Sequence, residues 1–341
     1  MESSLPDATD WSTINWYNVI KYIDKLQKRI YRAESNRNYR KVRDLQRMLI
    51  RSKAALLLAI KRVTQINKGK RTPGIDGFRA LNDEKRGELF DTLNKKDFKL
   101  HKPKSAYRKY IWKKNGKLRS LGIPTVVDRI YQEIIRMALE PQAEVNFEPT
   151  SYGFRPARGC HDAADRIMKN IMSGNWCWVF EGDFKSCFDT LDHEFILKQI
   201  KKFPLYNLVE RFLKAGYVEN NIFHSTDDGT PQGGIISPLL ANIAFNGMED
   251  VLNISYQKRR YKTGRVTHIT EGNYRMIRYA DDFVILAKSK EDIEKVYDIL
   301  NHYLQERGLE LAEDKTRITH ISEGFDFLGF VRQEGSPFFN Q

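Results

Sequence analysis

The sequence predicts an α+β fold, in which a helical N-terminal region is followed by a sheet of split βαβ topology. Two observations support this prediction. Apolar residues recur at helical spacing from 15 to 33 and again from 39 to 65. From Trp176 onward the pattern reads strand, helix, two short strands, helix and strand, which is the order of a split βαβ sheet. The 341 residues are enough for two or three structural units with buried cores.

Residues 1–72 are predicted to form a basic helical extension, with two helices separated by a polar break at 34–38. From Lys21 to Arg71 there are 17 Lys or Arg and three acids, a net charge of +14, which exceeds the +13 of the whole chain. Charge this concentrated indicates a polyanionic partner such as a nucleic acid. The alternative is a solvated basic face on an ordinary helical hairpin.

Residues 73–175 contain a second basic run, from Lys99 to Arg119, with nine Lys or Arg and no acid. Asn115-Gly116 predicts a β-hairpin turn within this run. Phosphates would meet its cations, while unpaired bases would stack on the interleaved aromatic rings. These rings belong to Tyr107, Tyr110 and Trp112.

Residues 176–330 contain an acid without a structural task. Asp183 follows a strand-like aromatic segment, where an Asp commonly caps a helix or forms a turn. Asp192 is the better cap, because the amphipathic run that begins at Phe195 follows it directly. Asp183 is therefore a candidate functional residue.

Two further acids, Asp281 and Asp282, lie at a tight corner between the strand-like segments 276–279 and 283–286. Adjacent carboxylates repel each other, and an ordinary hairpin turn would use Asn-Gly or Asp-Gly. A divalent cation such as Mg²⁺, which prefers carboxylate and phosphate oxygens, would neutralise them. For this stretch taken alone, a solvated acidic turn is the alternative.

These motifs resemble those of a known family. Tyr279-Ala280-Asp281-Asp282, with the upstream Asp183 and Phe188-Asp189, is similar to the catalytic motifs of reverse transcriptases. Other segments resemble one branch, the reverse transcriptases encoded by bacterial group II introns, which also act as splicing maturases. In family order these segments are 72–77, 121–129, 151–156, 315–316 and 325–330. Residues 229–238 resemble the loop that reverse transcriptases in general place under the incoming nucleotide.

The resemblance, which extends from about Tyr22 to Phe330, implies the fingers (73–175) and palm (176–330) of a right-hand polymerase. It also implies an RNA-directed DNA polymerase that uses two Mg²⁺ ions and deoxynucleoside triphosphates (dNTPs). The implied catalytic and metal-binding residues are Asp183, Asp281 and Asp282. The implied nucleotide-binding residues are Lys113, Arg119, Phe188, Gln232 and Lys315.

Individual roles follow from the resemblance. Phe188, five residues after Asp183, would be a steric gate against the ribose 2′-hydroxyl. Lys315 would protonate the leaving pyrophosphate. Gln232 would contact the sugar or base of the nucleotide, and the neighbouring Gly233 permits close backbone approach. A loop that merely enters a helix, and a solvated surface lysine, are the respective alternatives for Gln232 and Lys315.

The implied partners are group II intron RNA and an RNA template with a DNA primer. For Arg155, anchoring of the core is an equal alternative to RNA contact. A competing function is an RNA-binding splicing cofactor in which the polymerase fold is a scaffold with little activity by itself. The candidate RNA-binding residues are Arg29, Arg32, Arg37, Arg40, Lys41, Arg43 and Arg155.

Composition limits the remaining possibilities. The sequence has neither a signal peptide nor a long apolar run, so we expect a cytoplasmic protein without a membrane partner. The three cysteines lack Cys-x-x-Cys spacing, and nothing indicates a homodimer. Only residues 331–341 follow the matching region, so we expect them to begin a linker to a helical thumb that is missing from this chain.

Overall fold

The computed structural model of the chain describes residues 10–112, 116, 118–230, 233–260, 266–332 and 339–340. The chain divides into two compact units. The first unit contains Met1–Asn146 and Ile196–Leu240, and the second contains Phe147–Phe195 and Ala241–Gln341. Two of the three boundaries between them fall inside helices, α8 (His193–Gln199) and α10 (Ser237–Phe245), and the other follows Asn146.

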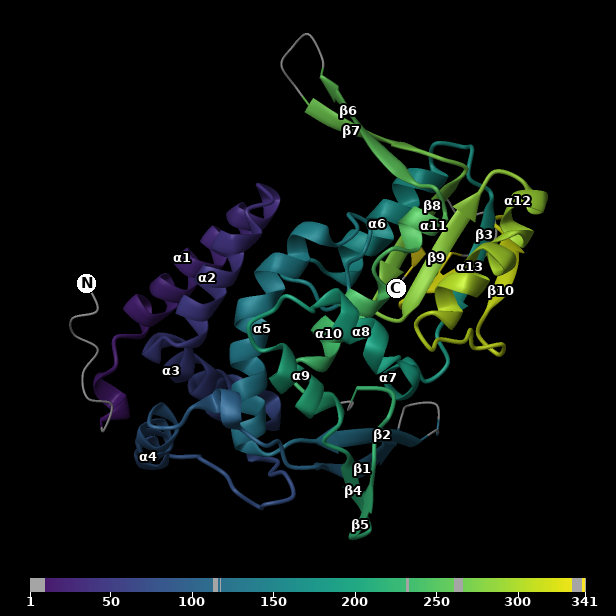
Figure 1. Cartoon of the computed structure of the whole chain (residues 1–341). Helices are drawn as coiled ribbons and strands as arrows, with labels where there is room; N and C mark the ends of the chain where they lie inside the picture. Colours follow the sequence, from purple (N-terminus) through teal and green to yellow (C-terminus); the bar gives the residue numbers. More distant parts are fainter. Residues whose placement is uncertain are drawn as a thin grey trace. The chain divides into compact units, whose positions relative to one another are not determined.

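The first unit contains a group of packed helices, and Figure 1 shows α1 and α2 side by side in purple. Helix α5 packs against both of them, and α3 packs against α1. The α-helices are α1 (Trp16–Ser35), α2 (Tyr39–Ile50), α3 (Lys53–Lys61), α4 (Asp83–Asn94), α5 (Val126–Asn146) and α9 (Tyr206–Leu213). Short helical turns are η1 (Trp11–Thr13), η2 (Arg62–Ile66), η3 (Lys68–Arg71) and η4 (Phe98–Leu100).

The helical spacing of the N-terminal region is confirmed, with one correction. The apolar stripe of α1 is buried, and Asn15 and Asn38 cap α1 and α2 by accepting backbone hydrogen bonds. The single helix expected from 39 to 65 is wrong, because the chain ends α2 at Ile50 and begins α3 at Lys53. Ser52 explains the break, since its hydroxyl accepts from the Ala55 amide at 3.1 Å and so caps a new helix.

A four-stranded sheet completes the first unit. Its order is β2-β1-β4-β5, with β1 and β4 parallel and the other pairs antiparallel. The predicted hairpin is confirmed by the pairing of β1 with β2, and most of its turn, at 113–115 and 117, lies outside the described residues. The strands are β1 (Ala106–Trp112), β2 (Leu118–Ile123), β4 (Tyr217–Glu219) and β5 (Ile222–His224).

The second unit is built on the predicted split βαβ sheet, an antiparallel sheet of order β10-β3-β9-β8. Helix α6 covers one face, where Ile167 and Ile171 pack with Val179 and Val284 of the sheet. Helix α12 contacts β3 and β9 and precedes α13. These elements are β3 (Trp178–Asp183), β8 (Tyr274–Tyr279), β9 (Asp282–Ala287), β10 (Arg317–His320), α6 (Cys160–Ile171), α12 (Lys290–Glu294) and α13 (Val296–Gln305).

Smaller elements extend the second unit. One is an antiparallel ribbon of two strands, and another is a three-stranded sheet of order β11-β12-β13. Within the described ranges, no helix has both the length and the apolar character required to cross a bilayer. The remaining elements are α7 (Cys187–Thr190), α11 (Met248–Val251), β6 (Ser255–Arg260), β7 (Val266–Glu271), β11 (Phe325–Phe327), β12 (Phe330–Arg332) and β13 (Phe339–Asn340).

Candidate active site

The three predicted acids lie at one end of the β10-β3-β9-β8 sheet of the second unit. Asp183 is the last residue of β3, Asp282 is the first residue of β9, and the two are partners in register. Asp281 lies in the two-residue turn between β8 and β9, after Ala280, whose φ is 58°. Two-residue hairpin loops require positive φ at their first position, where glycine is favoured, so Ala280 holds a conformation that an L-residue adopts at some cost.

The prediction for the helix cap is confirmed, which leaves Asp183 available for function. Asp192 Oδ1 accepts a hydrogen bond from the Phe195 amide at 2.5 Å at the start of α8. Asp183 is buried, with 7% exposure, and its side chain forms an ion pair with the Lys315 ammonium. Lys315, which was expected near the triphosphate, therefore lies beside a catalytic candidate.

Electrostatics in this cluster favour a cation. Burial and the nearby carboxylates of Asp281 and Asp183 raise the pKa of Asp282 to about 7, while Lys315 opposes the rise. The hydrogen bond to Asp183 raises the pKa of Lys315 above its usual value, so this ammonium stays charged at neutral pH. The negative charge of three acids exceeds the positive charge of one lysine.

Asp183 and Asp282 line a cavity of about 380 Å³, together with Lys315, Arg317 and Asp326. Within the described ranges, no group of three or more His, Cys, Asp or Glu side chains is arranged to hold a metal ion. The donor chemistry nevertheless fits a divalent cation, because carboxylate oxygens are the ligands that Mg²⁺ prefers, and the carboxylates of Asp281 and Asp183 add to burial in raising the pKa of Asp282.

Phe188 and Arg155 belong to the same unit as the acids. Phe188, in the short helix α7, is buried and meets the ring of Phe154 edge-on, with centroids 6.3 Å apart. Arg155 is buried too, and its Nη1 donates to the carbonyls of Glu148 and Ser151 at 2.6 and 2.7 Å. These bonds are those expected of a core-anchoring arginine, and an RNA contact by Arg155 stays a prediction.

Three nucleotide-binding candidates belong to the first unit. Arg119 is an exposed residue of β2, opposite Ile111 in the hairpin. Lys113 and Gln232 lie outside the described residues. Beside Gln232, Gly233 has φ +122° and a Cβ there would lie 2.6 Å from the Gly122 carbonyl oxygen. The backbone at Gly233 is therefore in close contact, as expected for this glycine, and its neighbour is the backbone of β2.

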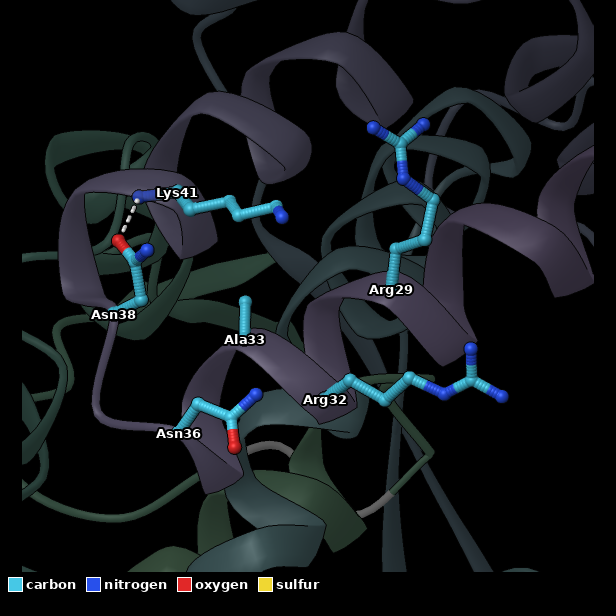
Figure 2. Close-up of a pocket in the computed structure, with 6 residues that line it drawn as sticks. All are labelled: Arg29, Arg32, Ala33, Asn36, Asn38 and Lys41. Atoms are coloured by element: carbon cyan, nitrogen blue, oxygen red, sulfur yellow. Dashed lines mark hydrogen bonds between the residues drawn. The ribbon is translucent and has the colours of Figure 1, made fainter.

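Six of the seven RNA-binding candidates lie on α1, α2 and their connection. Arg29, Arg32 and Lys41 line a pocket of about 270 Å³, which we call the basic pocket. Its other lining residues are Ala33, Asn36 and Asn38. Figure 2 shows Arg29 and Arg32 coming from one helix and Lys41 from the next, with Asn38 accepting from the Lys41 amide at 3.1 Å.

The remaining candidates in this region, Arg37, Arg40 and Arg43, follow the end of α1. Arg37 lies in the connection with φ 56°, and Arg40 and Arg43 lie on α2. The candidates thus lie on both sides of the break between α1 and α2, and RNA binding by them stays a prediction.

Sequence reasoning missed the buried residues that support the Ala280–Asp281 turn. Arg278, fully buried in β8, donates to Asn242 and to the carbonyl of Ala280. One sequence feature could have found it, since Arg278 is a charged residue between Ile277 and Tyr279 in a segment read as a buried strand. A charge in such a strand is expected to have a buried partner.

The chain matches two family models. The model for the N-terminal domain of reverse transcriptase matches residues 11–93, and the model for reverse transcriptase (RNA-dependent DNA polymerase) matches residues 111–331. The second match contains all three acids and spans more than half of the chain.

Individual proteins are similar as well. Group II intron-encoded protein LtrA of Lactococcus lactis subsp. cremoris is 36% identical over 331 residues, covering 79% of this chain and 54% of LtrA. Protein YkfC of Escherichia coli (strain K12) is 36% identical over 296 residues, covering 79% of this chain and 77% of YkfC. The chain therefore spans about half the length of LtrA and about three quarters of YkfC.

A solved structure shows the same fold at low sequence identity. Telomerase from Candida albicans, in complex with a fragment of telomeric RNA, has a TM-score of 0.51 and 13% identity, covering 70% of this chain and 45% of telomerase. The likeness confirms the predicted fingers-and-palm fold. Taken with the family models and the similarity to LtrA, it shows that the chain belongs to the reverse transcriptase (RNA-dependent DNA polymerase) family and is homologous to group II intron-encoded proteins.

Proposed function

We propose that this chain is the catalytic part of an RNA-directed DNA polymerase of a group II intron, which copies intron RNA into DNA and binds that RNA to assist splicing. The observation that carries the proposal is the pairing of Asp183 with Asp282 across β3 and β9, with Asp281 in the adjoining turn and a cavity at the acids. Similarity to LtrA supports the intron as the source of the RNA.

Reverse transcriptases use divalent metal ions and dNTPs, and we infer that this chain uses two Mg²⁺ ions held by Asp183, Asp281 and Asp282. When bound, the ions would activate the primer 3′-hydroxyl and neutralise the triphosphate. Such chemistry depends mainly on positioning and charge, so carboxylates are sufficient and no activated nucleophile is needed.

The other residues of the second unit have distinct tasks in this proposal. The Lys315 ammonium, protonated beside Asp183, gives its proton to the leaving pyrophosphate. Phe188 closes the space that a ribose 2′-hydroxyl requires. In the first unit, Arg119 binds triphosphate oxygens, with Lys113 and Gln232 as further nucleotide contacts.

RNA recognition is assigned to the N-terminal helices. The basic pocket brings the charges of Arg29, Arg32 and Lys41 to one place on the surface, where an RNA backbone would release counterions on binding. The same observation favours a second candidate function, an RNA-binding splicing cofactor with little polymerase activity by itself. The two functions differ in whether the three acids are required, because primer extension needs them and RNA binding does not.

The test is Mg²⁺-dependent extension of a DNA primer on an RNA template, measured alongside binding of a structured intron RNA. The chain is compared with the double variant Asp281→Asn, Asp282→Asn. Extension that is lost in the variant while RNA binding survives supports the polymerase. If neither protein extends a primer but both bind RNA tightly, the splicing cofactor is the better function for this chain.

A further inference from the structure

Arg278 is the largest fully buried side chain of the described residues. It lies in β8, three residues before Asp281. Its Nη1 donates to Asn242 Oδ1 at 3.0 Å and to the carbonyl oxygen of Ala280 at 3.2 Å. Its Nη2 lies 3.7 Å from Glu148 Oε2. A buried guanidinium is costly unless it is paired, so three acceptors around one side chain indicate a specific task.

Asn242 connects Arg278 to a second contact with the turn. With 1% exposure on α10, it accepts from Arg278 and donates from Nδ2 to the Gly153 carbonyl at 2.8 Å. Gly153 itself packs against the turn, because a Cβ at this position would lie 2.2 Å from the Ala280 nitrogen and 2.8 Å from the Tyr279 carbonyl carbon. Asn242 thereby fixes the loop that supports the hairpin from outside.

Glu148 fixes the other end of this network. Its Oε1 accepts from the amides of Gly247 and Glu249 at 2.9 and 2.8 Å, at the beginning of α11. Its Oε2 faces Arg278. The guanidinium therefore faces, at ion-pair distance, a carboxylate that is itself fixed by backbone amides.

The contact with Ala280 is the one that reaches the acids. The Ala280 carbonyl and the Asp281 amide share one planar peptide unit. A hydrogen bond to that carbonyl fixes the orientation of the peptide plane. It therefore also fixes the direction in which the Asp281 side chain projects from the backbone. Because Ala280 has φ 58°, the turn needs outside support to hold this conformation.

We propose that Arg278 is a positioning residue for nucleotidyl transfer, which acts through the Ala280 peptide and, with Asn242 and Gly153, holds Asp281 and Asp282 in the geometry that binds metal. The expected effect of Arg278 on primer extension rests on the proposed function. Its expected effect on metal binding by the acids does not. Lysine cannot replace arginine here, because one ammonium nitrogen cannot take the places of both Nη1, which donates to Asn242 and Ala280, and Nη2, which faces Glu148.

Arg307 provides a matched control. It is a buried arginine of the same unit, with 7% exposure, and it donates to the carbonyls of Ala244 and Tyr303 at 2.8 and 2.9 Å. None of its acceptors belongs to the 278–283 hairpin. Substitution of either arginine removes bonds from a buried guanidinium, but only Arg278 contacts the turn that carries the acids.

The experiment compares the chain with Arg278→Lys, Arg307→Lys and Asn242→Ala. Mn²⁺ binding to the metal-free protein is titrated by electron paramagnetic resonance, with Asp281→Asn, Asp282→Asn defining the contribution of the acids. Thermal unfolding and the kcat and KM for dNTPs are measured in parallel. Asn242→Ala leaves both buried charges in place and tests the network if Arg278→Lys does not fold.

We expect Arg278→Lys to weaken acid-dependent Mn²⁺ binding and lower kcat by about 10- to 100-fold, the usual effect of losing an outer-shell contact, with little change in KM. Asn242→Ala should act in the same direction, and Arg307→Lys should lower thermal stability only.

Equal effects of Arg278→Lys and Arg307→Lys on Mn²⁺ binding and kcat would overturn the proposal, as would the absence of acid-dependent Mn²⁺ binding in the unmodified chain. If the chain binds Mn²⁺ in an Arg278-dependent manner but extends no primer, the proposed polymerase function fails, while the role of Arg278 in holding the acids in the geometry that binds metal stands.

Discussion

The ring of Phe283 occupies the space in which a side chain at Gly182 would lie. A Cβ at position 182 would be 2.3 Å from Phe283 Cζ, and the two residues are partners across β3 and β9. Each is adjacent to a catalytic candidate, Gly182 to Asp183 and Phe283 to Asp282. The absence of a side chain at one position and the size of the other therefore set how the two acids face each other.

Gly182→Ala is expected to displace the Phe283 ring and to impair the site. The ring has little room to move, because the rings of Phe180 and Phe184 lie 6.0 and 5.1 Å from it, centroid to centroid. Overpacking of this kind costs about 1–3 kcal/mol of unfolding free energy. Denaturant unfolding and acid-dependent Mn²⁺ binding would measure the two effects.

The double variant Gly182→Ala, Phe283→Leu provides the control for this prediction. Leucine is smaller than phenylalanine, so the new methyl group finds space, and the double variant should be more stable than the sum of the two single changes predicts. Strictly additive effects would show that the contact between these two residues does not set the stability of this region.

Asp282→Asn is expected to stabilise the metal-free protein at neutral and alkaline pH. Because the folded-state pKa of Asp282 is raised to about 7 from an ordinary value of 3.8, the folded state binds this proton more tightly than the unfolded state does. The contribution of Asp282 to the free energy of unfolding is then fully present below about pH 4 and is lost as pH rises through 7. Asparagine removes that loss, which is roughly 1–3 kcal/mol after allowance for partial exposure.

Thermal unfolding of the metal-free chain and of Asp282→Asn between pH 4 and pH 8.5 measures this difference. The curves should diverge with rising pH, and Mg²⁺ should stabilise the unmodified chain most at high pH, where Asp282 is ionised. Parallel curves across this range would show that Asp282 titrates near its ordinary value.

Much of the fold follows from local patterns in the sequence. The two strands around Asp281 and Asp282 could be predicted because apolar residues flank the acids on both sides, and α1 could be predicted because its apolar stripe has one period throughout. The break between α2 and α3 was missed, since Arg51-Ser52 continues the helical spacing and only the capping hydroxyl of Ser52 ends it.

The support of the site could not be predicted in the same way. Gly153, Asn242 and Glu148 are separated from Arg278 by long stretches of sequence, and their hydrogen bonds depend on tertiary packing rather than on any local pattern. Gly182 and Phe283 show the same limit, because neither residue by itself indicates that one ring fills the space beside the other. Local motifs indicated the acids, and only the structure shows what holds them.

Charge removal at the basic pocket is expected to weaken RNA binding without abolishing primer extension. In the triple variant Arg29→Gln, Arg32→Gln, Lys41→Gln, loss of three phosphate contacts should reduce the slope of log K against log salt by about 1 for each contact. Filter binding of a structured intron RNA over a range of salt concentrations measures that slope.

An equal loss of charge elsewhere in the first unit provides the matched control. Lys85, Lys95 and Lys96 are exposed residues on or just after α4, and none of them was predicted to bind RNA. The triple change of these lysines to Gln should leave affinity and slope nearly unchanged. If both triple variants lose the same affinity, RNA binding depends on net charge and not on the basic pocket.

Phe188→Ala tests sugar selection. If the Phe188 ring closes the space beside the nucleotide's C2′, its removal should improve incorporation of ribonucleotides relative to deoxyribonucleotides by about 10- to 100-fold, the range by which a shaped pocket discriminates small groups. Single-nucleotide extension with matched dNTP and ribonucleotide substrates, expressed as the ratio of kcat/KM values, measures selectivity separately from overall activity.

Phe154→Ala is the control for this change, because the Phe154 ring meets Phe188 edge-on but is itself 48% exposed. Its loss removes an aromatic contact without opening the space that Phe188 fills, so the kcat/KM ratio should change little even if activity falls. An increase in ribonucleotide use limited to Phe188→Ala identifies this ring as the gate. A similar increase in both variants would instead mean that the Phe154–Phe188 pair maintains the shape of the loop, and that sugar selection depends on another residue.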